Sequence, residues 1–226
     1  MTVMEQNKKK VGLCFGSFNP PHLGHVKTAS FARDAYKLQE VWMMPVPVSA
    51  FKRGIPQPDF SRKIDMCEII ARPQQDWLKV TKLCQPFPPN PVLQLQAFKR
   101  LFEKLENVRP DTHFSVVAGP DFKYRLQVAV TMMNMANILA SVVQAGKLSD
   151  IPLILRVAER ISRSHDVLSN IQVLTPPTRS VLEGSDKPVS SAKIRQAIRE
   201  GKDDIPGVPP ELIGYIRRNN VYPATP

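Results

Sequence analysis

The sequence predicts an α/β fold in which helices cover both faces of a doubly wound parallel sheet. Two observations indicate this fold. Apolar segments of strand length alternate with segments of helical spacing, and those strand segments are apolar throughout, as in strands that are buried on both faces. A length of 226 residues fits one such domain. We therefore expect a polar tail over residues 1–9 and a single domain over residues 10–226.

The first half of the pattern begins with an apolar run at Val11–Phe15, which predicts a short buried strand. A Gly, Ser, Asn and Pro loop follows it, and a helix is expected at Leu23–Leu38. A second apolar run predicts a strand at Glu40–Val46. Asp59–Ala71 carries its apolar residues at helical spacing, which predicts the next helix.

The middle of the chain continues the alternation. A strand is expected at Trp77–Thr81, and four prolines within Gln85–Pro91 predict a loop. Val92–Leu105 has helical spacing. Phe114–Ala118 is an apolar run that ends at a Gly-Pro-Asp turn, which predicts another strand.

The last part of the chain begins with Lys123–Leu148, which predicts one long helix or two. Its clustered methionines are more typical of core or subunit contact than of a cofactor site. Strands are expected at Ile151–Val157 and Ile171–Leu174, and helices at Ser190–Glu200 and Pro209–Asn219. No repeat and no internal domain boundary interrupts this order.

Composition narrows the class of protein. No apolar run approaches the ~18 residues of a membrane span. The cysteines Cys14, Cys67 and Cys84 have no CxxC spacing, which argues against a disulfide framework or a zinc site and favours a reducing compartment, cytoplasmic or nuclear. The net charge of +11 fits either a surface that binds nucleic acid or a pocket for phosphorylated small molecules.

A candidate phosphate site lies in GSFNPPHLGH, residues 16–25, which leaves the first strand and enters the first helix. In doubly wound sheets, ligands bind beyond the carboxyl ends of the strands, and free N–H groups at a helix start favour phosphate. Gly16 lets the backbone approach a ligand, while His22 and His25 are three residues apart and can face one side. The alternatives are an ordinary Pro-rich turn with solvent-facing histidines, or half of a metal site that no neighbouring ligand completes.

A second candidate opens a late helix with VSSAKIR, residues 189–195. Ser190 or Ser191 can cap this helix, and Lys193 and Arg195 add positive charge near its start. Arg195 can hold phosphate oxygens with two N–H groups. Taken alone, this segment is better interpreted as a normal capped helix with solvated cations. The pair of helix starts in one sheet is more informative than either one.

Residues 16–25 resemble the (H/T)xGH motif of nucleotidylyltransferases, and SSAKIR resembles their ISSTxIR motif, with Ala192 in place of the Thr. Within that superfamily the chain is most similar to nicotinamide or nicotinate mononucleotide adenylyltransferases. Residues 46–71, the strand and G-x-D turn at 114–121, and the closing helix at 208–222 are similar as well. No Trp matches the residue with which that family often stacks the pyridine ring.

The resemblance implies a Rossmann-like fold of nucleotidylyltransferase type and an enzyme that joins ATP to a pyridine mononucleotide, releasing pyrophosphate. It implies catalytic roles for His22, His25 and Arg195 and Mg²⁺ bound with the ATP, and assigns no metal ligand to the protein. The mononucleotide would contact Gly16, Ser17, Phe18 and either Lys52 or Arg53. The residues implied in ATP binding are Gly16, Ser17, Phe18, His25, Gly119, Asp121, Ser190, Ser191, Lys193, Ile194 and Arg195.

Other interpretations remain open at this stage. Both motifs also allow a nucleotidylyltransferase that acts on a phosphopantetheine or an alcohol phosphate. An aminoacyl-tRNA synthetase would need a longer chain and a KMSKS loop. A basic nucleic-acid-binding protein would show salt-sensitive binding and no pyrophosphate release. We expect neither nucleic acid nor membrane as a partner, and we expect a homo-oligomer.

Overall fold

The computed structural model describes residues 8–47, 57–83, 91–117, 173–174 and 190–223 of the chain. Its strands are β1 (Lys9–Gly16), β2 (Glu40–Pro45), β3 (Leu78–Val80), β4 (Thr112–Val117) and β5 (Val173–Leu174). Its α-helices are α1 (Leu23–Tyr36), α2 (Phe60–Ala71), α3 (Pro91–Val108), α6 (Ser191–Arg199) and α7 (Pro210–Arg218), with one 3-10 turn at Arg72–Gln74.

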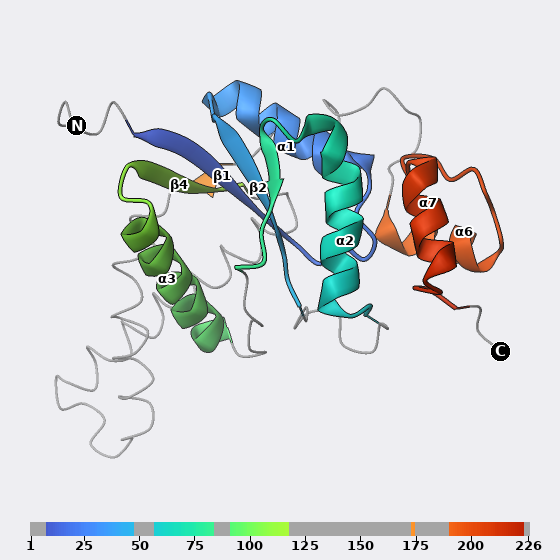
Figure 1. Cartoon of the computed structure of the whole chain (residues 1–226). Helices are drawn as coiled ribbons and strands as arrows, with labels where there is room; N and C mark the ends of the chain where they lie inside the picture. Colours follow the sequence, from blue (N-terminus) through green and yellow to red (C-terminus); the bar gives the residue numbers. More distant parts are fainter. Residues whose placement is uncertain (1–7, 48–56, 84–90, 118–172, 175–189, 224–226) are drawn as a thin grey trace, which may run out of the picture.

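The five strands form one parallel sheet in the order β3-β2-β1-β4-β5 (Figure 1). β1 lies in the middle, where Val11 pairs with Glu40 of β2 on one side and with Phe114 of β4 on the other. The chain therefore winds outward in one direction from β1 to β3 and returns to build β4 and β5. The doubly wound parallel sheet predicted from the sequence is confirmed.

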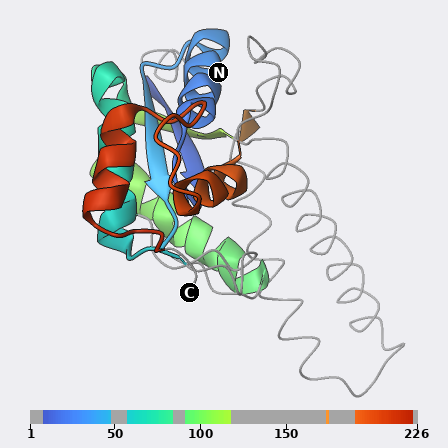
Figure 2. The ribbon, with the colours of Figure 1, turned by 90° about the vertical axis from the view of Figure 1, so that its right-hand side faces the viewer.

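Helices cover both faces of this sheet, and each face has its own apolar core. In β1, Leu13 packs with α3, whereas the next residue, Cys14, packs with α1 and α2 on the opposite face. Figure 1 shows α3 on the other side of the sheet from α2, and Figure 2 shows α7 beside α2. Hydrogen bonds from Tyr215 to Asp65 and from Arg72 to Glu211 join these last two helices.

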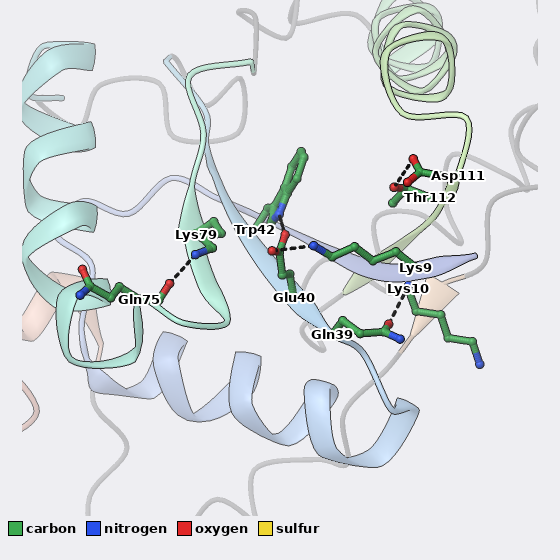
Figure 3. Close-up of polar contacts among 9 residues, drawn as sticks. All are labelled: Lys9, Lys10, Gln39, Glu40, Trp42, Gln75, Lys79, Asp111 and Thr112. Atoms are coloured by element: carbon green, nitrogen blue, oxygen red, sulfur yellow. Dashed lines mark hydrogen bonds and ion pairs between the residues drawn. The ribbon is translucent and has the colours of Figure 1, made fainter. Parts of the chain in front are cut away.

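Polar contacts fix the amino ends of the central strands (Figure 3). Glu40 accepts hydrogen bonds from Lys9 Nζ at 2.7 Å and from Trp42 Nε1 at 2.8 Å. Burial opposes ionisation of Glu40, but these two donors lower the pKa of its carboxyl below the ordinary value. In doubly wound sheets ligands bind at the opposite edge, beyond the carboxyl ends of the strands.

The predicted elements match the structure closely, with differences of a few residues at several boundaries. The loop expected over residues 85–91 ends earlier, because Pro91 is the first residue of α3. Proline suits a first helical position, where its missing N–H would have had no intrahelical partner. β1 begins at Lys9, the last residue of the expected tail.

Several predictions lie outside the described residues. These are the elements at 123–148 and 151–157, and the site residues Lys52, Arg53, Gly119 and Asp121. Among the helices that the structure describes, none is long and apolar enough to cross a membrane.

Candidate functional site

The first motif forms a tight turn between the carboxyl end of β1 and the start of α1. Phe18 has a φ of 40°, in the left-handed region that non-glycine residues rarely adopt, and its ring is buried. The ring lies against Gly16, where an added Cβ would come within 2.6 Å of it. Glycine at position 16 is therefore required for this turn to fold back on itself.

The two histidines of this motif lie together at the start of α1. His22 is the N-cap residue, and its ring centroid lies 3.8 Å from that of His25. The backbone N–H of His22 donates to His25 Nδ1 at 3.1 Å. Because Nδ1 accepts, the neutral His25 ring carries its proton on Nε2, which is then a hydrogen-bond donor. The ring edge of Phe18 also contacts His25, with centroids 4.9 Å apart.

Gly24 leaves the space that this histidine pair occupies. A Cβ added at Gly24 would lie 2.9 Å from His22 Nδ1, closer than real Cβ contacts allow. A side chain here would push the His22 ring away from its place. The glycine between the two histidines is thus a packing requirement of the site.

The second motif opens α6 beside this turn. Ser190 is the N-cap, and its Oγ accepts from the backbone N–H of Lys193 at 3.3 Å. Ser191 Oγ donates to the carbonyl of Pro20 at 2.9 Å. The guanidinium of Arg195 donates to the carbonyl of Asn19 at 2.6 Å in a buried contact. The two motifs, far apart in sequence, are therefore bonded directly to each other.

Asn19 is the residue on which these contacts converge. It is fully buried, and its side-chain oxygen accepts from the hydroxyl of Tyr222 at 2.7 Å. Its backbone carbonyl is the acceptor for Arg195. The sequence did not single out Asn19 or Tyr222, because contacts over such separations leave no local pattern. Burial raises the pKa of the Tyr222 hydroxyl, which keeps it protonated as a donor.

The side chains of the remaining residues of the second motif differ in solvent exposure. Lys193 is exposed, whereas the side chain of Ile194 is in the core and its backbone N–H donates to the carbonyl of Ser190 at 3.0 Å. Burial lowers the pKa of the Arg195 guanidinium, and Arg199 lowers it further while Tyr222 opposes both. An arginine pKa stays far enough above neutrality that Arg195 remains a cation. One of its five N–H donors serves Asn19.

Two other features of the described residues, possible metal ligands and a surface depression, bear on the choice of site. Within the described parts of the chain, no group of three or more His, Cys, Asp or Glu residues could hold a metal ion. A depression of about 590 Å³ lies along α2 and β3, lined by residues such as Arg72 and Lys79 and by none from either motif. The candidate site is the junction of the two helix starts, where Ser191 and Arg195 donate to the carbonyls of Pro20 and Asn19.

A doubly wound parallel sheet with two helix N-termini joined at its carboxyl edge is typical of α/β nucleotide-binding proteins. The match to known proteins narrows this class. The chain belongs to the cytidylyltransferase-like family, whose model matches residues 13–197 and so spans both motifs.

Curated relatives match over nearly the whole chain. A probable nicotinate-nucleotide adenylyltransferase of Flavobacterium johnsoniae is 28% identical over 214 residues, covering 94% of this chain and 98% of the relative. One from Myxococcus xanthus, with the same name, is 27% identical over 216 residues and covers 94% of each protein.

Solved structures agree on the fold. The nicotinic acid mononucleotide adenylyltransferase of Plasmodium falciparum, complexed with NaAD, superposes with a TM-score of 0.55 at 15% identity. The match covers 96% of this chain and 98% of that one. The complex of the same enzyme with APC gives a TM-score of 0.52. At this identity the likeness shows a shared fold.

Proposed function

We propose that this chain is an adenylyltransferase that joins ATP to a pyridine mononucleotide and releases pyrophosphate, a step in NAD synthesis. The observation that carries the proposal is the direct bonding of the two motifs, through Arg195 to Asn19 and Ser191 to Pro20. Family membership and the names of the full-length relatives support it. Those names favour nicotinate mononucleotide over the amide as the preferred acceptor.

The reaction needs no covalent intermediate with the protein. A phosphate oxygen of the mononucleotide attacks the α-phosphorus of ATP and forms a new P–O bond. The bond between the α-phosphorus and the oxygen that bridges it to the β-phosphorus breaks. The electron pair leaves with pyrophosphate. The protein must hold two polyanions in line, and such positioning supplies up to roughly 7–11 kcal/mol in well-oriented systems.

The ATP phosphates are assigned to the junction of the two helix starts. His25 Nε2–H donates to a phosphate oxygen, held in place by the bond from the His22 backbone to Nδ1. Arg195 and Lys193 offset the charge that builds on pyrophosphate as it leaves. Ser190 caps α6, and the backbone N–H groups at the start of this helix present the positive end of its dipole.

The mononucleotide is assigned to the backbone of Gly16, Ser17 and Phe18, with Lys52 or Arg53 reaching it from the segment after β2. The adenosine ribose is assigned to Gly119 and Asp121. Mg²⁺ enters as part of the MgATP substrate, held by phosphate oxygens and water, as is usual for this ion.

The same proposal extends to the compartment and the partners of the protein. Cys14 and Cys67 are free and buried thiols, which fits a reducing intracellular compartment, cytoplasmic or nuclear. We also propose a homo-oligomer without nucleic acid or membrane as a partner, and the net charge of +11 then serves anionic substrates.

One assay tests the proposal. Purified protein is given MgATP with nicotinate mononucleotide, nicotinamide mononucleotide, phosphopantetheine or glycerol phosphate, and pyrophosphate and product mass are followed. We expect pyrophosphate and a dinucleotide product with the pyridine mononucleotides alone. Product from phosphopantetheine or glycerol phosphate alone would assign a different acceptor, and salt-sensitive binding to RNA or DNA without pyrophosphate release would overturn the enzyme assignment.

A further inference from the structure

Lys63 in α2 is a charged side chain with no exposed surface. Lysine is almost never buried completely unless its ammonium is matched by partners. Here Nζ donates to the carbonyls of Val46 at 3.0 Å and Pro47 at 2.9 Å, and to Gln57 Oε1 at 2.9 Å. An ammonium has three protons, and each of these acceptors can take one of them.

The three acceptors flank one segment of the chain. Val46 and Pro47 follow the last residue of β2, and Gln57 precedes α2, with residues 48–56 between them. Lys63 therefore ties together the two places where residues 48–56 leave and rejoin the described fold.

The same acceptors reach the first motif. The N–H of Val46 donates to the carbonyl of Gly16 at 2.9 Å. On the other side, Ser17 Oγ lies 3.5 Å from Gln57 Oε1. Gly16 and Ser17 are thus connected to Lys63 through two of its three partners, Gly16 by a short backbone bond to Val46 and Ser17 by a long side-chain contact with Gln57.

We propose that Lys63 is a positioning residue for the mononucleotide subsite. It holds Val46, Pro47 and Gln57 together, and so sets the place of Gly16 and Ser17. A neutral side chain could not supply three donors from one atom at this depth. This inference rests on the proposed function, because it assigns the mononucleotide to this side of the site.

Lys63→Met, which keeps the length of the side chain but removes the donors, is the first test. The KM values for nicotinate mononucleotide and for ATP are measured separately, with Lys79→Met as a control that removes an exposed lysine from β3. We expect the KM for the mononucleotide to rise about tenfold or more in Lys63→Met, with the KM for ATP nearly unchanged. Lys63→Arg, which restores a buried cation with several donors, should recover most of the loss.

A purely structural role would act differently, lowering the fraction of active enzyme and the melting temperature without separating the two KM values. Gln57→Met provides a second variant at a half-buried position, and it decides the question if Lys63→Met fails to fold. Gln57→Met should show a smaller rise in the KM for the mononucleotide, again with the KM for ATP nearly unchanged.

Equal changes in both KM values, or an unchanged mononucleotide KM in the folded variants, would overturn the role of Lys63 while leaving the enzyme assignment intact. A wild-type protein that releases no pyrophosphate with any mononucleotide would overturn both.

Discussion

The single substitution Arg195→Met tests the contact between the two motifs directly. The substitution keeps an unbranched chain in a buried position but removes the donor to the Asn19 carbonyl. A hydrogen bond from a charged donor contributes about 1.5–3 kcal/mol, and the carbonyl left behind is itself buried. We therefore expect the free energy of unfolding to fall by about 2 kcal/mol, measured by denaturant titration.

The effect on turnover should be larger than the effect on stability. Loss of one preorganised donor to developing charge costs roughly 2.7–4 kcal/mol of transition-state stabilisation, a fall of about 10²–10³ in kcat. The control is Arg199→Met, which removes an exposed arginine from the same helix and should leave kcat nearly unchanged. Pyrophosphate release is measured for both variants at saturating substrates. A folded Arg195→Met protein with the kcat of the wild type would refute the assigned role of this guanidinium.

Three further changes probe neighbouring features. His25→Asn keeps an acceptor for the His22 N–H but lacks the Nε2 donor, so kcat should fall about 10²-fold or more with little change in melting temperature; a variant with wild-type kcat would refute the donor role. Gly24→Ala should raise or preserve the melting temperature, since alanine favours helix by up to about 1 kcal/mol, yet lower kcat by displacing the His22 ring; unchanged kcat would contradict that displacement. Burial and the hydrogen bond to Asp65 raise the pKa of Tyr215 to about 12 from 10. Between pH 10 and 12 the folded protein therefore keeps a proton that the unfolded chain loses, so the free energy of unfolding should decline across this range. Tyr215→Phe should remove part of that decline in alkaline denaturation curves, and an unaltered curve would count against it.

The sheet could be predicted from the sequence because its signals are local. The apolar run of β1 and the glycine, proline and asparagine after it fix a strand and a turn, and the histidine spacing places both rings at one helix start. The error at Pro91 has a local cause as well, since a proline inside a loop and a proline that opens a helix look alike without the structure.

The contacts that assemble the site are not local, and that is why they were missed. Asn19 meets Arg195 and Tyr222 across separations of 176 and 203 residues. No periodicity in the sequence pairs positions so far apart. Lys63 adjoins the predicted apolar face of its helix, but lysine ordinarily points to solvent, so its complete burial becomes visible only in the folded chain.

The central claim is that residues at the starts of α1 and α6 bind the triphosphate of the same ATP molecule. Side-chain nitrogen NMR of labelled protein, titrated with the non-hydrolysable analogue α,β-methylene ATP and Mg²⁺, measures this directly. We expect the His25 Nε2 and Arg195 guanidinium resonances to shift together, with one shared dissociation constant. A titration in which only one of the two residues responds would contradict it.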